Sequence, residues 1–377
     1  MSIVQLSNNN RIIKKISNGL EYFKRELISI NASYKIYFPY HSALRHPVFS
    51  ELVKHPPLNY TNRKNARLYH QIQGVSKADL GNKNIVEVID HALSILAPYY
   101  GHSLSCNEYS ENVNLARTIY ESPNIKKVLF ISEGQKRLFE NYFPIEGLVQ
   151  KSRVIPVPWK DNIKFKSNNF GGKRRYLLIA SDYITKGVPL VLEAWKKFAT
   201  SNPGSELSLV SHDLPQEKEN QLHESVTLYR EAPLTRKNKE RLYAQSDVVI
   251  ATTLTDGVTA IEATSFGKPV IVFRNQHSND FVNRENGVVI DVPINIYDEG
   301  YGKIWKTNEE YSELIKQQYI KGGFDEVVER LIHAFTIFRE SKTIVQYTQN
   351  AVEKYYEFHT IDSRNRALME VYEEVYE

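Results

Sequence analysis

The stretch DVVIATTLTDGVTAIEATSFGKPVIVF (residues 247–273) reads as an apolar strand, a helix and a second apolar strand. The helix begins near Thr259 and ends at Gly267, with Pro269 just beyond it as a stop signal. Both strands are continuously apolar rather than alternating, which is typical of a parallel sheet that is covered on both faces. The stretch therefore predicts one repeating unit of a parallel α/β domain.

The same rhythm continues on both sides of this stretch. RYLLIAS (175–181) predicts a buried strand, and the helix after it carries apolar residues on one face: Val188, Val191, Leu192, Trp195 and Phe198. Further strands are predicted at 206–211, 226–229 and 287–292, with a helix over 236–246. Alternating strands and helices predict a doubly covered parallel sheet in this half of the chain.

The first half of the chain has a weaker pattern. It predicts an amphipathic helix over 11–28 and strands at 34–38, 84–89, 126–131 and 153–157. The interval 41–80 is rich in His, Pro and Asn and receives no assignment. A polar, Gly-containing segment over 161–175 indicates a domain boundary. Residues 350–377 have helical character, with these apolar points: Phe358, Ala367, Val371 and Tyr372.

Length and composition limit the class of protein. A chain of 377 residues is longer than a single core usually supports, which favours two domains. It contains no run of about 20 apolar residues and no signal-peptide pattern at its start. Its single cysteine, Cys106, excludes an internal disulfide and fits a reducing cytosol. Its net charge of +4 comes from dispersed Lys and Arg, which argues against nucleic-acid binding and suits an anionic ligand or membrane surface.

The segment Asp256–Gly267 has the features of a phosphate site. It joins a strand to a helix, whose first amides carry free N–H groups at the positive end of the helix dipole. Gly257 permits close approach of a ligand to the backbone. Glu262, one turn further, can accept hydrogen bonds from sugar or ribose hydroxyls. The alternative interpretation is an ordinary strand–helix junction with a surface glutamate.

A second junction, Ser181–Gly187, places Lys186 near the carboxyl edge of the same predicted sheet. Open α/β sheets bind their ligands at this edge. An ammonium group there would neutralise a diphosphate and stabilise the negative charge of a departing one. The alternative is a solvated lysine that precedes a helix.

The run from Tyr176 to Asp291 resembles the nucleotide-binding domain of the retaining, GT-B-fold group 1 glycosyltransferases. The matching pieces occur in family order: KGV, RLYAQSDVVIATT, DGVTAIEATSFGKPVIV and ENGVVIDV. Outside this run, three further segments are similar to family elements: VLFISEGQKRLF (128–139), SRVIPVPW (152–159) and YYEFHTIDSRNRALMEVYEEV (355–375). The family includes enzymes that make bacterial polysaccharides, glycolipids and sucrose phosphate.

This resemblance implies a GT-B architecture of the α/β class, with two facing Rossmann-like domains. Residues 1–165 would form the acceptor-binding domain and residues 166–350 the nucleotide-sugar-binding domain. Residues 351–377 would form a C-terminal helix that packs back on the first domain.

The resemblance also assigns roles to individual residues. It places Lys186 and Ser181 in the donor site, the backbone of Gly257, Val258, Thr259 and Ala260 on the distal phosphate, and Glu262 on the donor ribose. It places His91, preceded by Asp90, beside the transferred sugar, although a histidine after a strand can also be structural or a surface residue.

Three positions depart from the family pattern. Leu254 stands eight positions before Glu262, where the family carries its first glutamate. The nearest acid is Asp256, so it is left open which carboxylate faces the sugar. Ser181 stands where an arginine often precedes Lys186. A glycine-rich loop after the first strand is replaced by FPYHSALRHP (38–47).

The function implied is transfer of a hexose-like sugar from a nucleoside-diphosphate sugar to an acceptor hydroxyl, with retention and without a metal or cofactor. The expected setting is bacterial surface polysaccharide, glycolipid or glycoprotein glycan synthesis. Two alternatives are a non-catalytic sugar-nucleotide-binding subunit and a GT-B epimerase or phosphorylase. The donor base, donor sugar, acceptor, linkage and oligomeric state are left open.

Expected partners are the donor and a glycan, lipid-linked or protein acceptor, with no nucleic acid. The expected location is the cytoplasm. Basic residues of the 11–28 helix suggest peripheral contact with an anionic membrane: Lys14, Lys15, Lys24 and Arg25. The alternative is that this helix packs on the first domain.

Overall fold

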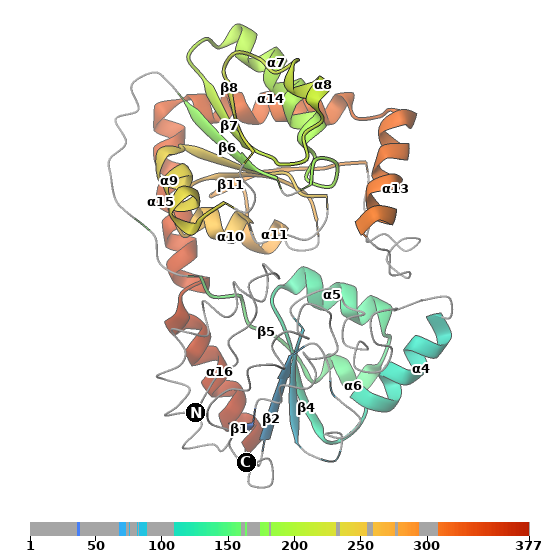
Figure 1. The fold of residues 1–377 in the computed structure, drawn as a ribbon. Coiled ribbons are helices and arrows are strands. Elements are labelled where there is room, and N and C mark those ends of the chain that lie inside the picture. The colour runs from blue at the N-terminus through green and yellow to red at the C-terminus, as the bar shows by residue number, and fades with distance from the viewer. Residues whose placement is uncertain are drawn as a thin grey trace. The chain divides into compact units, whose positions relative to one another are not determined.

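The computed structural model describes residues 36–37, 68–72, 75, 81, 83–88, 109–159, 163, 174–180, 182–230, 234–254, 259–275, 278–293 and 308–376. These residues fall into two compact units. The first comprises the described residues before Asp161 together with those of Phe358–Glu377, and the second comprises those within Asp161–Asp298 and Lys306–Glu357. Both units are of the α/β class and each is built on its own parallel sheet (Figure 1).

The second unit contains a six-stranded parallel sheet with the order β11-β10-β9-β6-β7-β8. Its strands are β6 (Arg175–Ile179), β7 (Glu206–Val210), β8 (Val226–Tyr229), β9 (Val248–Ala251), β10 (Val270–Phe273) and β11 (Gly287–Ile290). Each lies within the corresponding predicted strand, so the sequence pattern is confirmed here. The first strand, β6, lies between β7 and β9, which is the doubly wound order of a Rossmann-type sheet.

Helices cover both faces of this sheet. On one face lie α7 (Val188–Ser201) and α14 (Asp325–Arg339), which contact each other. On the other, α9 (Arg236–Gln245) contacts β6, and α10 (Thr259–Thr264) contacts β9 and β10. The remaining helices of this unit are α8 (Gln216–Glu219), α11 (Ser278–Phe281), α13 (Asn308–Lys321) and α15 (Ser341–Phe358).

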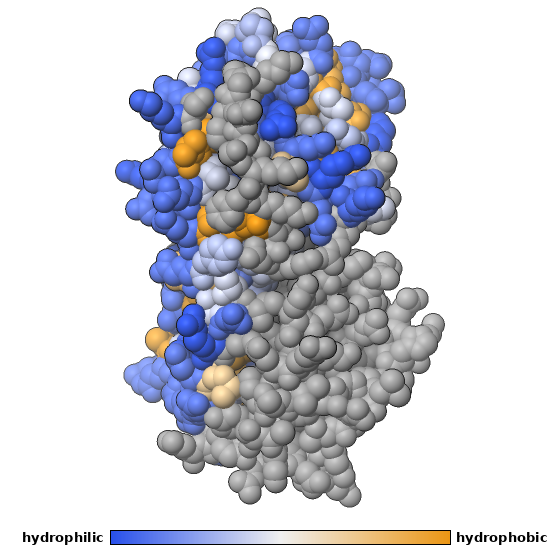
Figure 2. Space-filling view, turned by 90° about the vertical axis from the view of Figure 1, so that its left-hand side faces the viewer, coloured by the Kyte–Doolittle hydropathy of each residue, from blue (hydrophilic) through white to orange (hydrophobic). Residues whose placement is uncertain are grey.

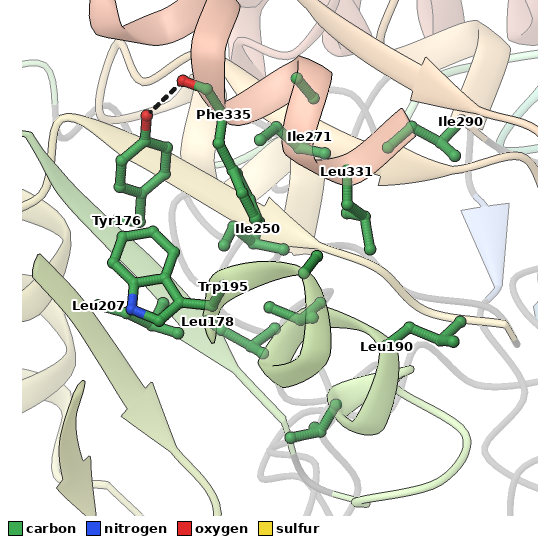
Figure 3. Packing of buried hydrophobic residues seen from close by; sticks show 14 of the residues in the cluster. Tyr176, Leu178, Leu190, Trp195, Leu207, Ile250, Ile271, Ile290, Leu331 and Phe335 are labelled. Atoms are coloured by element: carbon green, nitrogen blue, oxygen red, sulfur yellow. Dashed lines mark hydrogen bonds between the residues drawn. The ribbon is translucent and has the colours of Figure 1, made fainter. Parts of the chain in front are cut away.

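An aromatic cluster holds α7 and α14 against the sheet. Tyr176 of β6, Trp195 of α7 and Phe335 of α14 meet edge to face, with ring centroids 5.2–5.5 Å apart (Figure 3). The Tyr176 hydroxyl donates to the Phe335 carbonyl at 2.8 Å, so its polar end is satisfied inside the core. Burial raises the pKa of Tyr176, which keeps this hydroxyl protonated and able to donate.

The first unit contains a five-stranded parallel sheet with the order β1-β2-β3-β4-β5. The strands are β1 (Ile36–Tyr37), β2 (Leu68–Ile72), β3 (Asn84–Val88), β4 (Ile125–Phe130) and β5 (Ser152–Val154), with helices α4 (Tyr109–Tyr120), α5 (Glu133–Tyr142) and α6 (Glu146–Val149). Four strands match the predicted ones. β2 lies in the interval that received no assignment, and α4 was not predicted.

The helical C-terminal segment is two helices rather than one. α15 ends at Phe358 and α16 runs from Ile361 to Tyr376. The Thr360 hydroxyl accepts a hydrogen bond from the Ser363 amide at 3.1 Å, which satisfies a free N–H at the start of α16. α15 belongs to the second unit and α16 to the first.

α16 packs on the first sheet through apolar side chains. Leu368, Val371 and Tyr372 form one buried cluster with Leu68 of β2, Ile85 of β3 and Leu129 of β4. The amide of Trp159, after β5, donates to the His359 carbonyl at 2.8 Å. Two ion pairs, Lys127–Glu374 and Arg153–Glu370, join the sheet to the same helix.

The described residues on the face drawn in Figure 2 are predominantly hydrophilic. On this face, hydrophobic residues form small, separate patches between hydrophilic ones. Among the helices that the structure describes, none combines the length and the apolar character that crossing a membrane requires. The predicted helix over 11–28, with its basic residues, lies outside the described residues.

Candidate functional site

The candidate site lies where the order of the second sheet reverses. From β6 the chain moves outward through β7 to β8, and then returns to β9 on the other side of β6. The connections that leave the carboxyl ends of β6 and β9 therefore run in opposite directions. Open α/β sheets bind their ligands at such a switch point, which we call the crevice. Lys186 follows β6, and Thr259, Ala260 and Glu262 follow β9, so these four expected site residues come after the two strands that flank the switch point.

Several of the expected site residues lie outside the described residues. These are Ser181, Asp256, Gly257 and Val258 in the second half of the chain, and Asp90 and His91 in the first. Their expected roles in donor binding and catalysis stay predictions.

The turn before Lys186 is fixed by its own side chains. Asp182 Oδ1 accepts from the Thr185 amide at 2.5 Å and from the Thr185 hydroxyl at 2.6 Å. Gly187 then adopts a left-handed conformation, with φ of 65°, and α7 begins at Val188. A Cβ at Gly187 would lie 2.6 Å from a Phe273 ring carbon and 2.9 Å from the Thr252 carbonyl, so only glycine fits here.

Hydrogen bonds tie this turn to the segment that follows β9. The Thr252 hydroxyl donates to the Lys186 carbonyl at 3.0 Å, and the Leu254 amide donates to the Thr185 carbonyl at 2.8 Å. Lys186 Nζ donates to the Thr253 hydroxyl at 2.9 Å. The ammonium group is therefore held at the crevice by residues from both sides of it. A positive charge in this place can bind an anion such as a diphosphate.

Leu254 stands eight positions before Glu262, where the resemblance led us to expect a glutamate. Its side chain is only 4% exposed and belongs to the hydrophobic core formed with α7 and α14. A hydrocarbon side chain in that core cannot bind a sugar hydroxyl. The neighbouring Thr253, which contacts Lys186, was not predicted as a site residue, although its place at the end of an apolar strand was a usable signal.

Glu262 lies in α10 and is paired within the protein. Its side chain is 8% exposed, and its carboxylate contacts two residues of α9. Lys239 Nζ donates to Oε2 at 2.5 Å and also contacts Oε1, and the Tyr243 hydroxyl donates to Oε2 at 2.9 Å. The sequence did not indicate Lys239 or Tyr243, because they come 23 and 19 residues before Glu262 on a separate helix.

No group of three or more His, Cys, Asp or Glu residues with the geometry to hold a metal ion occurs in the part of the chain that the structure describes.

Residues 174–297, which contain this crevice, match the family model described as Glycosyl transferases group 1. This unit is similar to group 1 glycosyl transferases. The match covers the strands from β6 to β11 and includes Lys186, Leu254 and Glu262. No match was found among curated protein sequences.

Solved glycosyltransferase structures are similar in fold over most of this chain. A glycosyltransferase from Rickettsia africae is 14% identical, with a TM-score of 0.54 over 89% of this chain and 80% of its own. Anabaena Alr3699/HepE in complex with UDP is 15% identical, with a TM-score of 0.55 over 87% and 82%. WaaG, a glycosyltransferase involved in lipopolysaccharide biosynthesis, is 16% identical, with a TM-score of 0.50 over 85% and 79%. The expected fold class is thereby confirmed: two parallel α/β units of the GT-B glycosyltransferase type.

Proposed function

We propose that this chain is a retaining glycosyltransferase that moves a sugar from a nucleoside-diphosphate sugar to an acceptor hydroxyl. The observation that carries the proposal is the hydrogen bond from Lys186 to Thr253, which fixes a cation between the β6 and β9 connections of a group 1-like domain. Anabaena Alr3699/HepE, which shares the fold, was solved with UDP and with UDP-glucose. Uridine nucleotides are therefore the first donors to test.

In this proposal the donor diphosphate lies at the crevice of the second unit. Lys186 neutralises part of its charge, with Ser181 beside it. The backbone of Gly257, Val258, Thr259 and Ala260 donates to the distal phosphate, since amides at the start of a helix have no partner within that helix. Glu262 accepts hydrogen bonds from the ribose.

The reaction breaks the bond between the anomeric carbon and the distal phosphate oxygen. The acceptor oxygen forms the new bond to that carbon, and the nucleoside diphosphate leaves with the electron pair of the broken bond. The proton of the acceptor hydroxyl passes to the released diphosphate or to water. Lys186 stabilises the negative charge that develops on the leaving group. Among the side chains of the proposed site, it contributes most to lowering the energy of the transition state. This electrostatic role needs no metal or cofactor. His91, Asp90 and Asp256 are the proposed groups around the transferred sugar.

The proposed acceptor is a glycan, a lipid-linked sugar or a protein, and nucleic acid is not a proposed partner. WaaG acts in lipopolysaccharide biosynthesis, which favours a role in bacterial surface glycan synthesis. The proposed location is the cytoplasm, with peripheral contact at the inner face of the plasma membrane.

One observation favours a second candidate function, a non-catalytic sugar-nucleotide-binding subunit. Leu254 stands at the position of the family's first glutamate, so this position offers the sugar no carboxylate. Its side chain is instead buried in the core. Such a subunit would bind a donor through Lys186 without transferring or hydrolysing its sugar.

Isothermal titration of the purified chain with UDP, ADP, GDP and their sugars tests donor binding. Replacing Lys186 with Ala should weaken the Kd by between about tenfold and a hundredfold, because a hydrogen bond to a charged group contributes about 1.5–3 kcal/mol. The exposed Lys196, in the third turn of α7, gives a matched control whose replacement by Ala should leave Kd unchanged. Equal affinities in the two variants would exclude the proposed role of Lys186.

The same preparation separates the two candidate functions. A catalytic protein should hydrolyse its donor slowly in the absence of an acceptor, and the Lys186→Ala variant should lose this activity even at donor concentrations above its Kd. Tight donor binding without hydrolysis or transfer to any acceptor would support the non-catalytic subunit.

A further inference from the structure

Two residues of α9 hold the carboxylate that is proposed to bind the donor ribose. Lys239 and Tyr243 are four residues apart, so they lie on the same side of the helix. Both reach Glu262 of α10: the Lys239 ammonium contacts both carboxylate oxygens, and the Tyr243 hydroxyl donates to Oε2 at 2.9 Å. The Glu262 carboxylate is thus held by two side chains of the neighbouring helix α9.

The Tyr243 contact lies in the protein interior. The Tyr243 side chain is fully buried, and its ring stacks on Phe266 with centroids 4.8 Å apart and planes 8° from parallel. Burial, with the adjacent Glu262 carboxylate, raises the pKa of Tyr243 well above its ordinary value, so the hydroxyl stays a donor at neutral pH. Lys239 is a quarter exposed, so it links the buried carboxylate to the surface.

This arrangement selects the kind of group that Glu262 can recognise. A carboxylate neutralised by an ammonium group and bonded by a phenol remains an acceptor, with about four lone-pair positions in all. A ligand that reaches it must therefore donate hydrogen bonds, as the vicinal hydroxyls of a ribose do. A ligand without one of these hydroxyls loses a charge-assisted bond.

Resting on the proposed function, we propose that Lys239 and Tyr243 are positioning residues that orient Glu262 toward the ribose hydroxyls and make the site selective for ribonucleotides over 2′-deoxyribonucleotides. Neither residue touches the reacting atoms. Their effect should appear in the ratio of the Kd for the 2′-deoxyribonucleotide to the Kd for the ribonucleotide. A purely structural contribution to the packing of α9 on α10 would not change this ratio.

The test compares Kd values for UDP, ADP and GDP with those for the 2′-deoxy forms of the same nucleotides. The wild-type protein should prefer the ribose form of the nucleotide that it binds by roughly tenfold, the effect of one hydrogen bond to a charged group. Lys239→Met should reduce this ratio to near one, mainly by weakening the ribose form. Lys239→Arg, which keeps the charge and the donors, should restore most of the ratio.

Lys237→Met is the matched control, because Lys237 is an exposed lysine on the same helix. Its ratio should equal that of the wild type. If Lys239→Met does not fold, as judged by circular dichroism, Tyr243→Phe removes a single donor at nearly constant volume and should lower the ratio in the same direction.

The outcomes separate this inference from the proposed function. If the wild type binds none of these nucleotides, the proposed function itself is wrong. If it binds them without preference for ribose, or if Lys239→Met and Tyr243→Phe both keep the wild-type ratio, only the positioning role is overturned.

Discussion

Gly187 is the residue on which the geometry of the crevice most directly depends. Its φ of 65° permits the turn that presents Lys186, and Phe273 and the Thr252 carbonyl leave no room for a Cβ. The sequence indicated the importance of the KG pair through resemblance. It could not indicate the steric reason, because Thr252 follows β9 and Phe273 belongs to β10, both far from Gly187 in the sequence.

Replacing Gly187 with Ala should destabilise the second unit by roughly 2–5 kcal/mol, the sum of the costs of a left-handed alanine and of an overpacked contact. Urea denaturation followed by circular dichroism measures this loss. Gly322 is the matched control, since it also has a positive φ (83°) but open space around its Cβ position. Replacing Gly322 with Ala should lower the free energy of unfolding only by the cost of a left-handed alanine backbone, about 1–2 kcal/mol. Equal losses in the two variants would show that the contacts around Gly187 relax freely.

Among the elements, α16 depends on a buried polar network for its place on the first sheet. Arg364 of α16 pairs with Glu87 of β3, each with a side chain 6% exposed, and also donates to the carbonyls of Ile155 and Pro156 at 3.3 and 3.2 Å. His70 of β2 lies between Glu87, at 3.2 Å, and the Tyr372 hydroxyl of α16, at 2.7 Å. The network thus joins two strands and one helix.

This network should make the first unit sensitive to acid. Burial alone would raise the pKa of Glu87, but Arg364 and His70 outweigh it and lower the pKa from 4.5 to about 2. Because the folded pKa lies below the unfolded one, the stabilisation is complete above pH 4.5 and is lost as the pH falls toward 2. The loss should reach about 3 kcal/mol.

Urea denaturation at a series of pH values between 6 and 2 checks this expectation, with Glu87→Gln as the variant. The variant should lack this part of the pH dependence, whatever its stability at neutral pH. Glu121→Gln, which changes an exposed carboxylate of the same unit, should keep the wild-type profile. A profile for Glu87→Gln that parallels the wild type would refute the assignment to Glu87.

Whether the sequence predicted an element depended on how apolar its pattern is. The strands of the second unit were found because they are continuously apolar, such as VVIA in β9. β2 was missed because its sequence, LYHQI, contains the polar residues His70 and Gln71, and His70 is buried only because Glu87 and Tyr372 satisfy it. α13 was missed because Ile315 alone among its described side chains is fully buried, so its helical pattern is weak.

At the scale of the molecule, the two units have different proposed tasks, and the donor site belongs to the second. Saturation with UDP at a hundredfold excess over Kd should stabilise that unit by about 2.7 kcal/mol. Hydrogen exchange measured by mass spectrometry should then slow in the segments around Lys186 and Thr253. Exchange in α4 of the first unit should not change. Protection confined to the first unit would contradict the proposed location of the donor.

The candidate site was predictable only in part from the sequence. Lys186 and Glu262 could be found because each lies a few residues after an apolar strand, in a segment with a family resemblance. The partners that hold them, Thr253, Lys239 and Tyr243, belong to other elements. Their roles follow from strand order and helix packing, which a linear pattern does not contain.

The pairing of α16 with β2, β3 and β4 has a consequence for synthesis on the ribosome. Arg364 and Glu87 are separated by 277 residues, and at about 5–20 residues per second roughly 14–55 s pass between their translation. During that interval the apolar face formed by Leu68, Ile85 and Leu129 lacks the cover of α16, and Glu87 lacks its ion-pair partner Arg364. The first unit to be translated is therefore the last to be completed, and its uncovered sheet is the part of the nascent chain most exposed to chaperones and to misassociation.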